Sequence, residues 1–237
     1  MVPMTTTPRN QYDSRLRDAL GAVDSSTRLR AALAAGTRPD PGLLEALVER
    51  CAVEPDFFVR DMLTWALTRL PRELTVPALV AELQSGSGQA RAQALHTLSK
   101  IGDVGAWPAL TAAVLRDPDD EVARSAWRAA VVLAPEAERP WLAEELTSQL
   151  GRGDGEMWRS LSRALVALGE VVEPVLADAR VSPDPTVSAH ARATSRMLAD
   201  PDGTDDPVLE EAKRVVALGP ERVAALDPHG AGQHADR

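Results

Sequence analysis

The chain has one cysteine, few aromatic residues and no long apolar run, and each shortage excludes a class of protein. The single Cys51 cannot form an internal disulfide, and it rules out a zinc site built from cysteines. Aromatic residues make up 3% of the 237 residues, which is too few for a β-sandwich of this size and favours helices. No apolar stretch approaches the roughly 18 residues of a membrane-spanning helix, so no membrane association is expected.

Catalytic motifs are also missing. The sequence has no HExxH, GxSxG, P-loop or GxGxxG pattern, and its four histidines are not spaced as metal-binding pairs. We therefore expect no enzyme activity, no metal site and no cofactor. The N-terminal stretch MVPMTTTPRN lacks a hydrophobic signal core, which predicts a cytoplasmic protein. Arginine outnumbers lysine 24 to 2, a bias typical of GC-rich bacterial genes.

Apolar residues and charge are plentiful but unevenly placed. Apolar residues form 44% of the chain, enough for a packed core. The net charge is −9, and residues 200–237 contribute −5 of it through nine acidic and four basic side chains. Residues 1–40 have a net charge of +2, from six arginines and four aspartates. The overall acidity disfavours a general nucleic-acid-binding protein.

An internal repeat dominates the sequence. Five segments share apolar residues at offsets 0, 4, 8 and 11, counted from the first residue of each segment. This spacing places the apolar residues on one face of a helix over three turns. Their starts are 31, 32, 35 and 30 residues apart, and Ser195 is the one polar member. The segments are Val59/Leu63/Leu67/Leu70, Ala90/Ala94/Leu98/Ile101, Val122/Ala126/Ala130/Leu133, Met157/Leu161/Leu165/Leu168 and Val187/Ala191/Ser195/Leu198.

Residues that cap helices occur at one fixed offset before these segments. Three residues ahead of each segment stand Asp56, Ser87, Asp119, Asp154 and Asp184. Each side chain can accept hydrogen bonds from the free N–H groups of a first helical turn. Because only about a fifth of the chain is Asp, Ser, Thr or Asn, five coincidences are unexpected by chance. The pattern therefore predicts five capped helices.

A second set of apolar segments lies between the capped helices. These shorter segments are Leu43–Arg50, Val76–Leu83, Trp107–Leu115, Trp141–Leu150 and Val172–Ala179. Each is long enough for two or three helical turns, so the repeating unit is helix A, a turn and helix B. Such a unit cannot bury its own apolar stripe, but stacked copies bury it between neighbours.

This pattern resembles HEAT repeats. The best stretches are VPALVAELQSGSGQARAQALHTLSKIGD from Val76 and AWPALTAAVLRDPDDEVARSAWRAAVVLA from Ala106. The resemblance implies an all-α fold, a right-handed α-solenoid of about five helix pairs with terminal capping helices. We expect residues 41–199 to form the repeat domain and residues 1–40 an N-terminal helical cap. Residues 200–226 are expected to form an acidic C-terminal capping helix, and residues 227–237 a disordered tail.

The B helices carry the candidate binding residues. Offsets 2, 5, 6 and 9 point away from the apolar positions, and in a HEAT stack this side lines the concave surface. The candidate residues, including one tryptophan at offset 1, are Trp65, His96, Arg124, Trp127, Arg128, Trp158, Arg159, Arg163, Arg192 and Arg196. They form either a basic, tryptophan-containing groove or a solvated helix face whose arginines pair with nearby acids.

The leading functional hypothesis is a monomeric, non-catalytic scaffold that binds an acidic protein or peptide in this groove. The resemblance also leaves open a nucleic-acid-binding protein. One such alternative is a HEAT-like alkylpurine DNA glycosylase with Asp61 or Asp120 as its acid. A third alternative is a lyase or chaperone for a tetrapyrrole, since some HEAT-like proteins attach bilins.

Overall fold

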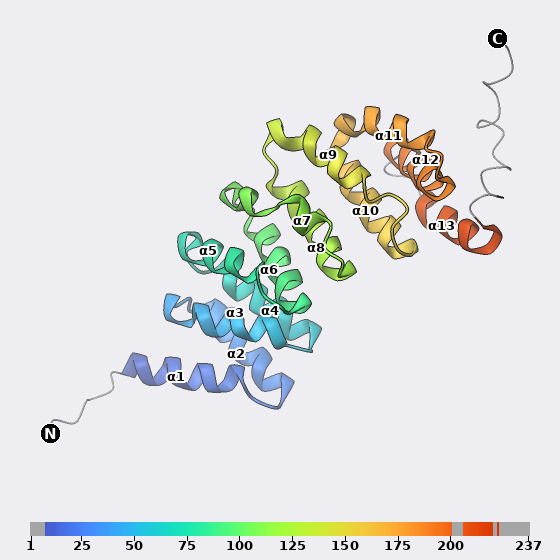
Figure 1. Ribbon diagram of the computed structural model, residues 1–237. Coiled ribbons are helices and arrows are strands. Elements are labelled where there is room, and N and C mark those ends of the chain that lie inside the picture. Colours follow the sequence, from blue (N-terminus) through green and yellow to red (C-terminus); the bar gives the residue numbers. More distant parts are fainter. Residues whose placement is uncertain (1–7, 201–205, 220–221, 223–237) are drawn as a thin grey trace, which may run out of the picture. The chain divides into compact units, whose positions relative to one another are not determined.

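The computed structural model describes residues 8–200, 206–219 and 222, and within them it contains helices and turns but no strand (Figure 1). The all-α prediction is confirmed. The chain divides into two compact units, residues 1–110 and residues 111–237, which are described one at a time. Residues 227–237, for which a disordered tail is expected, lie outside the described residues.

Unit 1 consists of helices that alternate between two layers. The A helices α3 and α5 pack on the B helices α4 and α6, and α2 packs along α4. The elements are α1 (Pro8–Leu20), α2 (Ser25–Thr37), the 3₁₀ turn η1 (Pro41–Leu43), α3 (Leu44–Val53), α4 (Phe57–Thr68), α5 (Arg72–Glu82), α6 (Gly88–Ile101) and η2 (Val104–Ala109).

Unit 2 continues the same alternation and ends in one additional helix. The B helices α8, α10 and α12 belong to consecutive repeats, and each packs on the next. Helix α13 packs on α10 and α12. The elements are α7 (Ala112–Leu115), α8 (Asp120–Leu133), η3 (Glu136–Glu138), α9 (Arg139–Thr147), α10 (Gly155–Ala167), η4 (Gly169–Val172), α11 (Glu173–Arg180), α12 (Pro185–Ala199) and α13 (Pro207–Leu218).

The five predicted caps are confirmed. Each cap residue has an extended backbone, and its side chain accepts from N–H groups of the following first turn. In α10, for example, an Asp154 carboxylate oxygen lies 3.0 Å from the backbone nitrogens of Glu156 and Met157. The caps therefore fix where every B helix of the repeats begins.

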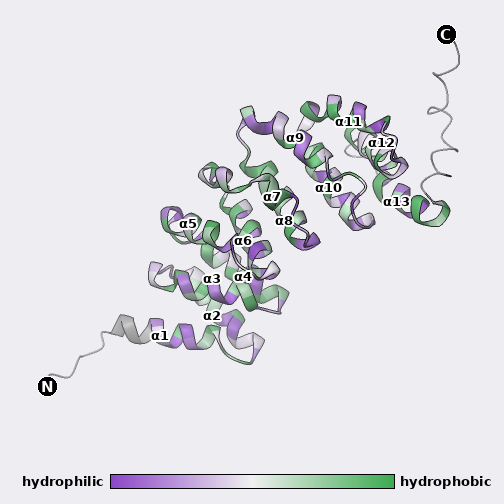
Figure 2. Ribbon diagram, viewed as in Figure 1, coloured by the Kyte–Doolittle hydropathy of each residue, from purple (hydrophilic) through white to green (hydrophobic). Residues whose placement is uncertain are grey.

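Most of the predicted apolar positions are buried in the core, and the longer helices also carry hydrophilic residues (Figure 2). In the segment that begins at Val122, all four positions are fully buried. In the last repeat only Ala191 is fully buried, while Val187, Ser195 and Leu198 are half-buried. In the part of the chain that the structure describes, no further helix pair packs on α12 at these positions, so their burial stays incomplete.

One predicted A helix is broken. The sequence predicts a single helix over Trp107–Leu115, but the structure has the 3₁₀ turn η2 and the one-turn helix α7 instead. Pro108 lies inside η2 and has no N–H to donate, and Leu110 has a non-helical backbone. Thr111 then caps α7 by accepting from the Val114 N–H.

A buried ion-pair network holds the start of unit 1 together. The fully buried Glu54 carboxylate accepts two hydrogen bonds of 2.7 Å from Arg28 on α2 and one of 2.7 Å from Arg50 on α3. Burial alone would raise the pKa of Glu54, but hydrogen bonds from Arg28, the Asp56 N–H and Arg50 outweigh it and lower the pKa to about 2. The network joins α2, α3 and the start of α4.

Candidate functional site

The B-helix face of unit 2 contains four of the ten predicted binding residues. It is formed by the residues at offsets 2 and 6 on three consecutive B helices. They are Arg124 and Arg128 on α8, Arg159 and Arg163 on α10, and Ala189 and Ala193 on α12. The contacts of these residues decide which of them a partner can reach.

Trp127 does not belong to a binding surface, contrary to the prediction. Its side chain is fully buried, and its indole N–H donates to the Leu115 carbonyl oxygen at 2.9 Å. Offset 5 is buried because a B helix contacts its neighbouring B helices as well as its own A helix, which widens the buried arc. The equivalent residues Thr64, Leu95 and Ser162 are buried for the same reason.

Trp158 is also a core residue rather than a surface anchor. It is 3% exposed, and its ring stacks on the His190 imidazole with centroids 4.3 Å apart and an angle of 4° between the planes. The expectation that Trp158 lines a groove is therefore wrong. Its ring instead forms the floor on which α13 packs, together with Ala189 and Ala193.

In unit 1, Trp65 and His96 are both half-buried. Trp65 lies against α2, where Gly36 makes room for it. A Cβ atom at Gly36 would stand 2.2 Å from the Trp65 ring, so any side chain there would displace the tryptophan. Trp65 therefore serves the contact between α2 and α4, although part of its surface faces solvent.

The arginines of α8 and α10 are largely paired with acids. Arg124 forms an ion pair with Glu121, and Arg128 reaches the same carboxylate at 3.8 Å. Arg159 lies 3.3 Å from Glu156. Its Nε is also 2.7 Å from the carboxylate of Asp206, the residue that caps α13. The B-helix face is therefore a mixed-charge surface, in line with the second of the two alternatives that the sequence leaves open, a helix face whose arginines pair with nearby acids.

Arg163 differs from its neighbours. It is exposed on α10, and among the described residues its side chain makes no ion pair or hydrogen bond. Arg128 is 55% exposed and has only the long contact with Glu121 and a bond of 3.1 Å to the Ser125 hydroxyl. Arg128 and Arg163 occupy the same offset on adjacent B helices, and they are the least paired arginines of this face.

The two arginines of α12, Arg192 and Arg196, make contacts within α12 and with α13. Arg192 donates to the Ser188 hydroxyl at 2.7 Å. Arg196 lies 3.2 Å from Glu211 on α13, and that carboxylate is buried. Arg196 is thus committed to an intramolecular contact with the C-terminal helix.

Helix α13 covers the last part of the B-helix face. Val208 and Ala212 of α13 are buried against Trp158, Ala189 and Ala193, with Met197 and Val215 packed at the edge. Gly155 at the start of α10 permits the close approach, because a Cβ there would lie 3.1 Å from the Leu209 side chain and 3.3 Å from Ala212. The sequence predicts a capping helix here but does not indicate which layer it covers.

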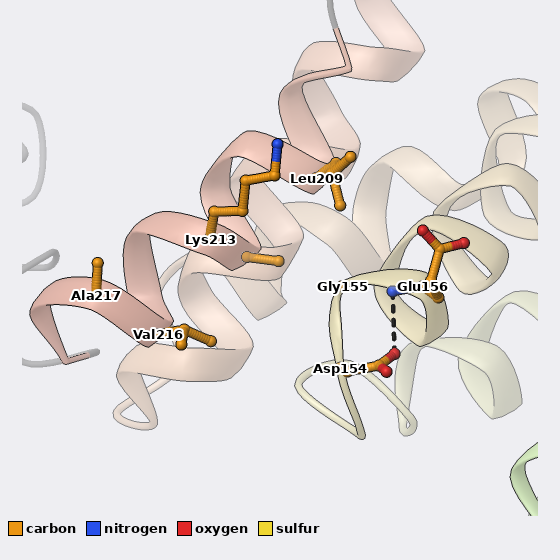
Figure 3. Close-up of a pocket in the computed structure, with 8 residues that line it drawn as sticks. Asp154, Gly155, Glu156, Leu209, Lys213, Val216 and Ala217 are labelled. Atoms are coloured by element: carbon orange, nitrogen blue, oxygen red, sulfur yellow. Dashed lines mark hydrogen bonds between the residues drawn. The ribbon is translucent and has the colours of Figure 1, made fainter.

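A cavity of about 330 Å³ lies between the first turn of α10 and α13 (Figure 3). On the α13 side its wall is mainly apolar, with Leu209, Ala212, Val216 and Ala217, and Lys213 at the edge. On the α10 side stand Asp154, Gly155 and Glu156. The first half of α13 therefore packs closely on its neighbours, while its second half leaves open space beside α10.

A buried polar cluster beneath this face was not anticipated from the sequence. The His190 Nδ1 accepts from the Gly151 N–H at 3.1 Å, and its Nε2 lies 3.0 Å from the Ser162 hydroxyl and 3.1 Å from the Trp158 carbonyl oxygen. Burial lowers the pKa of His190 to about 3, so the imidazole is neutral. Because His190 is fully buried, this cluster stabilises the fold and is not accessible to a substrate.

The two acids considered for a glycosylase have different surroundings. Asp120 accepts from Arg152 at 2.7 and 3.1 Å, which holds the loop before α10 against α8. Asp61 lies on α4 of the other unit and is exposed. Within the part of the chain that the structure describes, no cluster of three or more His, Cys, Asp or Glu residues is placed to hold a metal ion.

The described helices include none that is long and apolar enough to cross a membrane.

Unit 1 exposes an aromatic pair that the sequence pattern does not single out. Phe57 and Phe58 at the start of α4 are 66% and 70% exposed, with ring centroids 5.7 Å apart. The signal in the sequence is their place directly after the cap Asp56, outside the apolar frame.

Comparison with known proteins supports the repeat assignment. Residues 59–131 match the family described as HEAT repeats. No match to a curated protein was found. Two solved structures titled as engineered proteins share 21% and 18% identity, with TM-scores of 0.44 and 0.43. The alignments cover 90% and 86% of this chain, and 97% of the engineered chain in each case.

A third solved structure is the complex of CpcE and CpcF of phycocyanin lyase from Nostoc sp. PCC7120. It shares 17% identity with a TM-score of 0.45, and the alignment covers 97% of this chain and 92% of that one. Likeness at this level concerns helical architecture and does not transfer an activity.

Proposed function

We propose that this chain, whose residues 59–131 are HEAT repeats, is a non-catalytic binding module for a protein or peptide. The binding surface is the B-helix face of unit 2, and the partner is a helical or extended segment that presents acidic side chains. Solenoid proteins bind such segments along the layer formed by their inner helices.

One observation carries this proposal. The face already holds an amphipathic helix of the same chain, since α13 packs on α10 and α12 through Val208 and Ala212, and its capping residue Asp206 lies beside Arg159. The adjoining part of the face, around Arg128 and Arg163, is exposed and carries the two least paired positive charges. The face therefore combines apolar contact, small residues and positive charge, which are the features that favour an acidic helix.

The pairing of the arginines argues against nucleic acid as the partner. A backbone-binding surface needs basic side chains that are free to neutralise phosphates. Here Arg124 and Arg159 are paired with Glu121 and Glu156, and these acids are themselves exposed and would repel phosphates. The protein's net charge of −9 acts in the same direction.

The test is an affinity capture with the full chain immobilised, followed by identification of the bound proteins. We expect Arg128→Glu/Arg163→Glu to lose the partner that the wild-type chain retains. Loss should be greatest at low salt, where charge interactions reach furthest. The matched control is Arg72→Glu/Arg180→Glu, which reverses two exposed arginines on the A helices α5 and α11.

Both double variants should keep the wild-type circular dichroism spectrum and melting temperature, because all four side chains are exposed. Equal capture by the wild-type chain and the Arg128→Glu/Arg163→Glu variant would show that the B-helix face of unit 2 is not the binding surface.

A further inference from the structure

We propose that α13 is a displaceable occupant of the B-helix face, and that a partner binds by replacing it with an amphipathic helix of the same pattern. That pattern is an aspartate N-cap, a small apolar residue two positions later, a glutamate after five positions and a small apolar residue after six. In α13 these residues are Asp206, Val208, Glu211 and Ala212. The inference rests on the function proposed above.

The position of α13 sets it apart from the repeats. The A helices pack on one another along the chain, as α11 does on α9. A further repeat would add its A helix to that layer. Helix α13 instead lies on the two B helices α10 and α12, where a partner of a solenoid binds. It is therefore placed as a ligand of the B-helix layer and not as the next structural element.

The apolar contact between α13 and this face is built from small residues. Val208 and Ala212 meet Ala189 and Ala193, and Gly155 at the start of α10 lets the helix approach closely. Small side chains on both sides let the backbone of a helix approach closely, so the contact does not need a large side chain inserted into a pocket. Any helix with Val or Ala at these two positions meets the same steric requirement.

Charge fixes the direction of the bound helix. The Asp206 carboxylate caps the first turn of α13 through the Leu209 N–H at 2.9 Å, and it also lies 2.7 Å from the Arg159 Nε. About one and a half turns later, Glu211 lies 3.2 Å from Arg196. Arg159 and Arg196 therefore bind two acidic side chains that stand five residues apart, and a helix bound in the reverse direction would lose both contacts.

The contact is limited, which makes displacement feasible. Among the apolar residues of α13 only Val208 and Ala212 are fully buried, whereas Val216 is 85% exposed and Leu218 is 40% exposed. The cavity beside Val216 and Ala217 leaves the second half of α13 without close packing on α10 (Figure 3).

Native-state hydrogen exchange of the wild-type chain provides the first test. We expect the amides of α13 to exchange through a local opening that leaves α10 and α12 protected. If the α13 amides become exposed only together with those of α10 and α12, then α13 is an integral part of the fold and the inference is overturned.

The second test measures binding of a fluorescein-labelled peptide that spans residues 206–219. Val208→Asp in the full chain places a charge against Trp158 and should release α13, so the peptide is expected to bind about tenfold tighter than to the wild-type chain. The matched control is Val216→Asp, the same change at an exposed position of the same helix, and it should bind the peptide as weakly as the wild-type chain does.

A peptide that carries Glu211→Arg should bind the Val208→Asp chain markedly less well, since it loses the contact with Arg196. Equal peptide affinity of the Val208→Asp and Val216→Asp chains would overturn the inference. If the arginine-dependent capture described above still holds in that case, the binding function stands and only the role of α13 fails. If that capture also fails, both proposals fall.

Discussion

The hydroxyl groups of Ser162 and Thr194 lie 2.7 Å apart in the buried contact between α10 and α12. Thr64 and Thr97 face each other at 3.4 Å between α4 and α6, and they occupy the same two offsets of their repeats. A third polar residue joins each pair from offset 3 of the second helix. It is Gln93 in unit 1, bonded to Thr64 at 2.7 Å, and His190 in unit 2, next to Ser162. Two pairs of neighbouring B helices, one pair in each unit, thus share a buried polar contact at the same offsets.

The neutral His190 makes the stability of unit 2 depend on pH. Its pKa is about 3 in the folded chain and near 6.5 when unfolded, so between these values only the unfolded chain binds the proton. The contribution of the neutral His190 to the free energy of unfolding is therefore fully present above about pH 6.5. It decreases as the pH is lowered towards 3, by at most about 1.4 kcal/mol per pH unit. Urea denaturation at several pH values between about 7 and 5 measures this slope.

His190→Gln should remove that slope while retaining a polar side chain at the same position. The lowered pKa of Glu54 affects stability only below about pH 4.5, so the two groups are separable. Identical slopes for the wild-type chain and His190→Gln would refute the assignment to His190.

Core leucines at the repeated positions should carry more stability than the C-terminal helix does. Leu98 and Leu165 are 1% and 0% exposed, and Leu→Ala at either site should reduce the free energy of unfolding by about 2–5 kcal/mol. Leu209→Ala should cost less because its side chain is half-buried beside the cavity. Chemical denaturation ranks the three variants, and a greater loss at Leu209 would contradict the placement of the core.

The buried Glu54 should be indispensable to unit 1. Glu54→Gln leaves Arg28 without a charged partner in the interior, and we expect a loss of about 3–5 kcal/mol in the free energy of unfolding. Glu49→Gln changes an exposed acid on α3, the helix that Glu54 directly follows, and should alter the free energy of unfolding by less than about 0.5 kcal/mol. If the two variants were equally stable, the network would not be a stabilising feature.

Cys51 should be unreactive in the folded chain. It is 4% exposed, and burial, together with the nearby charge of Glu54, raises the pKa of its thiol to about 12. Because the thiolate is the reactive species, modification by a thiol reagent such as DTNB should occur only after denaturant is added. Rapid labelling under native conditions would show that the α3 region opens readily.

Much of the helical pattern follows from local sequence. Asp119 predicts the start of α8 because a cap bonds to N–H groups two and three residues ahead, whatever surrounds it. Val122 and Ala126 predict its core-facing side because helical periodicity alone brings them together. At Pro108 and Leu110 the local pattern was insufficient, since it predicted one helix over Trp107–Leu115 where the chain forms η2 and α7.

The sequence by itself determined the all-α fold, the repeating helix pairs, the five caps and the apolar face of each B helix, because these depend on contacts within a few residues. Only the tertiary structure decided that offset 5 is buried, where Trp127 bonds to Leu115 of α7 and Ser162 meets Thr194 of α12. The pairing of Arg159 with Asp206 likewise depends on where α13 packs. Periodicity within a helix identifies its faces, whereas the assignment of each face to solvent, to a neighbour or to the chain's own C-terminal helix requires contacts between residues far apart in sequence.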